Sequence, residues 1–168
     1  MVRKALSHNT ILLTSAPVGR FLEGHLDNDD GLLPGFAVEV VPDSDEVGGR
    51  VSWRAYQGTT GERTLIAILL ENELVGMNCQ QAISDGQKVR MYCPIPGDEL
   101  LVRVSSGTTF TGTGTGISLE IGDKLILNNG GFFVASTGTP EREPFIVMEE
   151  IEDIDAHGGL VHVMYTGC

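Results

Sequence analysis

The densest cluster of side chains capable of chemistry lies near the C-terminus. Six potential metal ligands or proton-transfer groups stand there: Glu149, Glu150, Glu152, Asp153, Asp155 and His157. Carboxylate oxygens are the ligands that hard cations prefer, and two neighbouring carboxylates can act as an acid–base pair. No nucleophile, oxyanion donor or pocket motif accompanies the run, and such charge is typical of a solvated edge. One possible function is therefore that of a small β-barrel, enzyme-like module that binds a metal or another ligand, and we keep it as an alternative to a purely structural role.

Two other segments resemble ligand-binding loops but lack key residues. Segment 27–31 reads Asp-Asn-Asp-Asp-Gly. Placing Gly31 at the sixth position of a calcium loop puts Leu26 at the first, where an acidic residue is needed. Segment 111–116 alternates Thr and Gly, yet neither a lysine nor a helix follows, as a phosphate loop requires. We predict a polar turn at 27–31 and a flexible loop at 111–116.

The spacing of cysteines and histidines does not match a cofactor site. Cys79, Cys93 and Cys168 are odd in number and irregularly spaced, and the four histidines share no metal-ligand spacing. Unpaired cysteines fit a reducing compartment, which for this chain would be the cytoplasm in which it is made. We therefore expect no cofactor, no structural metal and no enzymatic activity.

The strong negative charge excludes two classes of direct partner. The 168 residues contain 11 Lys and Arg against 23 Asp and Glu, which gives a net charge of −12, and 22 are glycine. Nucleic acids and anionic membranes repel so acidic a chain, so neither is expected as a direct partner. The longest apolar run, residues 65–70, is far shorter than the roughly 20 residues of a membrane-spanning helix.

Short apolar runs bounded by Gly, Pro, Asp or Asn predict a mainly β fold of short antiparallel strands. The candidate strands are residues 36–41, 51–55, 64–70, 88–92, 100–104, 117–121, 124–127, 131–135, 145–149 and 160–165. Only residues 71–83 carry a partial helical stripe. We expect one short helical turn near Met77–Ala82 and less than about 15% helix, against a usual share of roughly a third.

A weak internal repeat runs through these strands. Gly35, Gly86 and Gly122 each begin a segment with apolar residues at its fourth and sixth positions. This spacing is typical of a tight turn that starts a half-buried strand. Residues 62–71 also resemble residues 141–150. The chain is thus predicted to contain two related β units, with ordinary turn–strand patterns as the alternative explanation.

Residues 1–31 differ from the rest, and we divide the chain into this N-terminal part and a β domain at 32–168. The first part is an extended arm or an early strand of the main sheet. Its apolar cluster would be costly to leave in water, and its basic residues could pair with an acidic partner. The candidate residues for contact with a partner protein or a neighbouring subunit are Arg3, Lys4, Ile11, Leu12, Leu13 and Arg20.

Segment 73–89 resembles the middle of the capsid decoration (cement) proteins of tailed bacteriophages. Pro96–Glu99 and 119–125 follow as in many of those proteins, 129–134 is similar to their hairpin, and 145–149 and 160–163 are similar to their final strand pair. The resemblance covers roughly residues 60–168 and consists of turns and strands rather than a catalytic signature. Residues 1–59 match less clearly.

The resemblance implies a small β-barrel or tulip-like domain with a structural role. Such proteins sit as homotrimers on the outer surface of the capsid in the virion, at three-fold and quasi-three-fold positions. They add to the expanded head and hold it against the pressure of the packaged DNA. The implied partners are the major capsid protein and further copies of the chain, and the lack of catalytic motifs agrees with this role.

Overall fold

The computed structural model describes the parts of the chain that form its β framework. These are residues 11, 21–41, 51–57, 66–71, 78–104, 119–127, 130–131, 133–135, 145–151 and 159–167. Within them the regular secondary structure is all β. The strands are β1 (Phe21–Leu26), β2 (Ala37–Val40), β3 (Ser52–Ala55), β4 (Ile66–Leu69), β5 (Lys88–Tyr92), β6 (Glu99–Arg103), β7 (Lys124–Leu127), β8 (Phe133–Ala135), β9 (Phe145–Val147) and β10 (Leu160–Tyr165).

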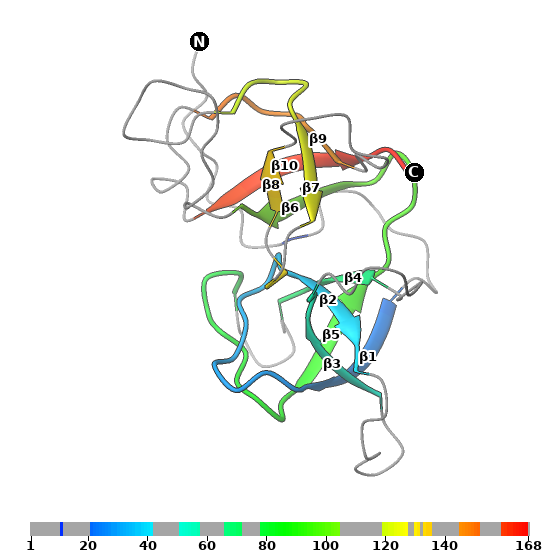
Figure 1. The fold of residues 1–168 in the computed structure, drawn as a ribbon, viewed down its shortest axis with the longest axis vertical. Helices are drawn as coiled ribbons and strands as arrows, with labels where there is room; N and C mark the ends of the chain where they lie inside the picture. The colour runs from blue at the N-terminus through cyan, green and yellow to red at the C-terminus, as the bar shows by residue number, and fades with distance from the viewer. Residues whose placement is uncertain are drawn as a thin grey trace.

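The strands form two units of five that follow one another along the chain. β1–β5 close into a barrel, and β6–β10 form a five-stranded sheet. Figure 1 shows the units stacked along the long axis, with the barrel below and the sheet above. The mainly β fold containing a small barrel, predicted from the sequence, is confirmed.

The two units share one topology. The barrel reads β3-β2-β4-β5-β1 and the sheet reads β8-β7-β9-β10-β6, so each strand has a counterpart five places later. The four pairings within each of these orders are antiparallel. An antiparallel bridge precedes β2 and β7 in the same way, joining Leu32 to Ile83 and Leu119 to Ile151. The prediction of two related β units is therefore confirmed.

One turn recurs four times and starts β2, β5, β6 and β7. Its glycine has a positive φ, which an amino acid without a side chain adopts at little cost: Gly35 (93°), Gly86 (71°), Gly97 (95°) and Gly122 (97°). Gly122 donates its N–H to the carbonyl of Val147, whose N–H returns a bond to Asp123 (2.9 and 2.8 Å). Gly35 and Phe36 make the same pair of bonds with Leu69. The repeat predicted at Gly35, Gly86 and Gly122 is confirmed, and the turn at Gly97 adds a fourth member.

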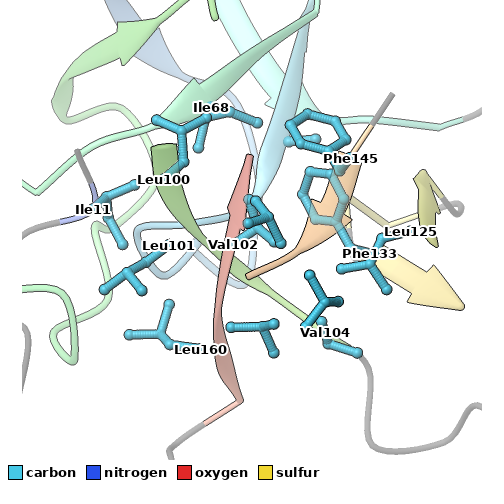
Figure 2. Close-up of a cluster of buried hydrophobic side chains, with 14 of the residues drawn as sticks. Ile11, Ile68, Leu100, Leu101, Val102, Val104, Leu125, Phe133, Phe145 and Leu160 are labelled. Atoms are coloured by element: carbon cyan, nitrogen blue, oxygen red, sulfur yellow. The ribbon is translucent and has the colours of Figure 1, made fainter. Parts of the chain in front are cut away.

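Alternation along the strands builds two apolar clusters. One fills the barrel and contains Trp53, Leu69 and Met91. The other fills the sheet unit and continues onto the outer face of the barrel, where Ala37, Ile68 and Tyr92 join it. Figure 2 shows the rings of Phe133 and Phe145 together in this second cluster, and their centroids lie 4.9 Å apart. The units thus share a core instead of touching only at their surfaces.

Three local expectations need correction. Residues 78–82 form a turn closed by a bond from Gln81 N–H to the Asn78 carbonyl (3.1 Å), so the predicted helical turn is absent from that described stretch. The predicted strand at 117–121 is reduced, in its described part, to a single bridge at Leu119. One pairing, β1 with β3, is parallel, and it is this pairing that closes the barrel.

Candidate functional site

The candidate site is the junction between the units, where a residue of the predicted arm meets the outer face of β6 and β10. Leu101, Arg103 and Leu160 lie on that face, because neighbouring positions on a strand point to opposite sides. The turn before β2 packs against it. A Cβ added to Gly35 would lie 3.1 Å from Arg103 Cγ and from Leu160 Cδ2, so the close approach requires glycine.

Ile11 fits into this junction through its backbone and its side chain. Its N–H donates to Glu71 Oε2 (2.9 Å), and its carbonyl accepts from Leu101 N–H (2.7 Å). The side chain is fully buried and belongs to the second apolar cluster, beside Leu101 in Figure 2. Ile11 therefore packs within its own chain, and it supplies the edge of β6 with an acceptor from far away in the sequence.

Arg103 connects three segments at the junction. Its N–H donates to the Gly35 carbonyl (3.0 Å) and its Nε to the Pro34 carbonyl (2.9 Å). Its Nη2 donates to the Cys79 carbonyl (2.5 Å) and to Gln80 Oε1 (3.3 Å). Burial lowers the pKa of the Arg103 guanidinium, and burial raises the pKa of the Cys79 thiol, partly offset by Arg103. The planar guanidinium carries several N–H donors and can therefore bind several backbone carbonyls at once.

A second contact between the units involves the β7–β8 hairpin and the barrel. Gly130 and Gly131 donate their N–H groups to the Tyr56 carbonyl (2.7 and 3.1 Å), and the Gly131 carbonyl accepts from Ala37 N–H (2.9 Å). A Cβ on Gly131 would lie 2.4 Å from the Ala37 carbonyl oxygen. The hairpin can approach the barrel only because this position is glycine.

Only one candidate contact residue lies in the described part of the chain. Ile11 is in the junction, and Phe21–Leu26 of the predicted N-terminal part forms β1 of the barrel. The other candidates lie outside the described residues: Arg3, Lys4, Leu12, Leu13 and Arg20. Their contact role, the N-terminal arm and the boundary at residue 31 stay predictions.

The acidic run and the polar turn are seen in part. Glu149 and Glu150 are described, whereas Glu152, Asp153, Asp155 and His157 lie outside the described residues. Across the described ranges, no three His, Cys, Asp or Glu side chains gather into a possible metal site. Segment 27–31 is the turn that was predicted. Asn28 N–H donates to Asp85 Oδ1 (2.9 Å), and the Asn28 side chain donates to the Gly31 carbonyl (3.0 Å).

Sequence reasoning missed the residues that organise the junction. Arg103 stands in an apolar strand, and such a buried cation must have partners. That signal could have singled it out, but its acceptors are mostly backbone carbonyls, together with Gln80 Oε1, and no motif identifies them. The sequence places Glu71 at the end of the repeated segment 62–71 and at the start of a partial helical stripe, and neither pattern indicates that its carboxylate is buried and accepts from Ile11 N–H.

No family model matches this chain, and no curated protein matches it. A solved structure titled as the head fiber gp8.5 N base in bacteriophage phi29 is similar to it, with 12% sequence identity and a TM-score of 0.49. The match covers 87% of this chain and 94% of that one. In the described part, no helix is long and apolar enough to span a membrane.

Proposed function

We propose that this chain is a structural, non-catalytic protein of a tailed-phage virion. It decorates the outside of the expanded head as a homotrimer, binds the major capsid protein and stabilises the shell against internal DNA pressure. The supporting observation is where the cement-like segments lie in the fold. Residues 82–89, 96–99 and 119–125 contain three of the four recurring turns and the starts of β5, β6 and β7.

The buried junction also suits a protein that must bear load. Hydrogen bonds to the backbone join residues that are distant in sequence, such as Ile11 with Leu101 and Ala37 with Gly131. Force applied across the units would have to break these bonds together with the shared apolar cluster. The acidity is a second support, because a chain repelled by DNA belongs on the outer side of a DNA-filled shell.

The test is binding of the purified chain to phage heads that lack it. Expanded and unexpanded heads are incubated with the protein and sedimented, and the bound copies per head are counted by quantitative gel densitometry. We expect saturable binding to expanded heads only, together with a higher temperature of DNA release. Equal binding to both forms, or none to either, would contradict the proposal.

The predicted arm is tested in the same assay. A chain lacking residues 2–20 but retaining its circular dichroism spectrum should lose head binding or trimer formation. If it keeps both, the arm is not the contact. Because Ile11 belongs to the core, a second variant that replaces Leu12 and Leu13 with Ser and keeps Ile11 separates loss of contact from loss of fold.

A further inference from the structure

Because the two units repeat one topology, a contact made by one unit has an equivalent surface on the other. The turn before β2 makes such a contact, and the equivalent turn before β7 does not. Within the chain, the turn before β2 rests on the outer face of the β6–β10 pair, with Gly35 against Arg103 and Leu160. The corresponding turn of the sheet unit, before β7, contains Ile121 and Gly122. A Cβ on Gly122 would meet nothing within 4 Å. Nothing in the described structure therefore covers this second turn.

The uncovered turn carries the most exposed large apolar side chain among the described residues. Ile121 is 67% exposed, against 46% for Val51 and 44% for Ile95. Glu120 beside it is also exposed. An isoleucine at the tip of an acidic turn is thus available to a partner that offers apolar contact and positive charge.

The face corresponding to β6–β10 offers that chemistry. It is the outer face of the β1–β5 pair, where His25 lies opposite Lys88 as Arg103 lies opposite Leu160. Lys88 and Arg90 are exposed on it, which is notable in a chain with a net charge of −12. Arg90 lies over the Phe21 ring (4.2 Å to the centroid), and Lys88 pairs with Glu23 (2.7 Å).

We propose that the turn at Glu120–Asp123 of one copy binds the outer face of β1 and β5 of a second copy. Ile121 packs against the part of Phe21 that the second apolar cluster leaves exposed, and Glu120 faces Lys88 and Arg90. The contact rests on side chains, because His25 N–H already donates to the Val51 carbonyl (3.2 Å). The two surfaces differ, so the interface is head-to-tail, and such interfaces close into rings when the rotation permits. This inference rests on the self-association in the proposed function and names the surfaces that carry it.

Substitution at the tip of the turn is the first test. The full-length chain, Ile121→Asp and the control Ile95→Asp are compared by light scattering over a concentration series. Ile95 is also an exposed isoleucine, in the turn before β6, and its replacement changes the charge equally. We expect Ile121→Asp to weaken association at least tenfold, and Ile95→Asp to have no effect. At concentrations where every chain is monomeric, both variants should keep the wild-type melting temperature, because only self-association links it to concentration. A monomeric wild type, or an Ile121→Asp chain that associates normally, would overturn the inference.

Charge reversal tests the pairing itself. Lys88→Glu should weaken association, and adding Glu120→Lys to it should restore association, which a merely structural defect would not allow. Failure of the second change to restore any association would count against the contact. Head binding is scored separately. A chain that associates through Ile121 but does not bind heads contradicts head decoration alone. Head binding by a monomer contradicts this inference and the trimer of the proposed function, and leaves head decoration standing.

Discussion

The barrel and the sheet have the same strand order, yet only the barrel closes. In the barrel β1 and β3 pair in parallel at two positions, including Leu26 with Trp53. In the sheet unit the counterpart is one bridge, between Val104 and Phe133. On β6 the N–H groups of Leu101 and Arg103 donate outside the sheet, to the carbonyls of Ile11 and Gly35. In the barrel the edge of β1 is closed by β3. In the sheet unit the equivalent edge of β6 instead binds Ile11 and the turn at Gly35.

A single residue position accounts for much of this difference. Gly24 lies two residues before Leu26, and Val102 lies two residues before Val104. A Cβ on Gly24 would be 2.4 Å from the Val51 carbonyl oxygen and 2.5 Å from Trp53 Cδ1. Glycine thus lets β3 and its tryptophan lie against β1, whereas the corresponding residue of the sheet unit is the buried Val102. We infer that closure of the five-stranded unit depends on the missing side chain at position 24.

The largest loss of stability is expected when Gly24 of the barrel is replaced by valine, the residue at the corresponding position of the sheet unit. Gly24→Val should destabilise the protein by about 3 kcal/mol or more, because overpacking against backbone and an aromatic ring cannot relax easily. Urea unfolding followed by Trp53 fluorescence measures it. The control is Gly86→Ala, where a Cβ has open space and only the positive φ opposes it, at about 1–2 kcal/mol. Equal losses in both variants would refute this account of closure.

The second prediction concerns the dependence of the sheet unit on a residue outside it. Ile11→Ala should cost about 3 kcal/mol, as expected for emptying a fully buried site. Ile121→Ala, at an exposed position, should change stability by less than about 0.5 kcal/mol. Chemical denaturation of both variants gives the comparison. A tolerated Ile11→Ala would mean that the sheet unit is stable without the segment around residue 11.

The third prediction separates corresponding positions in the two units. Arg103→Met should cost about 2 kcal/mol, because the carbonyls of Pro34 and Cys79 lose their donor while staying buried. His25→Met changes the counterpart on β1 and should cost about 0.5 kcal/mol or less. Thermal unfolding by calorimetry should show the difference. Similar melting temperatures for the two variants would show that Arg103 does not hold the junction.

The smallest effect is expected from pH. Burial raises the pKa values of Cys79 and Cys93 above the ordinary thiol value of 9.0. The unfolded chain then loses these protons at lower pH than the folded chain. Stability should be unaffected well below pH 9 and should fall as the pH rises above it. A Cys79→Ala, Cys93→Ser variant should show a shallower decline in urea titrations at pH 8 to 10, and an unchanged slope would contradict the prediction.

Local patterns predicted most of the strands but not how the units join. Apolar runs ending at glycine turns located nine of the ten strands in the described part of the chain, because turn chemistry and alternation act within a few residues. The pattern at Phe21–Leu26 does not distinguish an arm from an early strand, since Gly24, which the barrel requires, interrupts its apolar residues. Most partners of Arg103 and Ile11 are backbone groups far away in sequence, and backbone groups carry no sequence signal. The side-chain partners, Gln80 and Glu71, match no motif that would assign them to these positions.

The contact between Ile11 and Leu101 also has a consequence for how the chain acquires its structure. During synthesis the N-terminal segment and Glu71 both leave the ribosome before β6 is made. The Ile11 carbonyl therefore lacks its donor, the Leu101 N–H, until β6 is in place. Contacts so distant in sequence are slow to form, because long loops must close first. The barrel strands can assemble early, but Ile68, Tyr92 and Ala37 on its outer face stay uncovered until the last strands are made. Newly made chains would then be most prone to aggregate in this interval, which places the demand for chaperones late in translation.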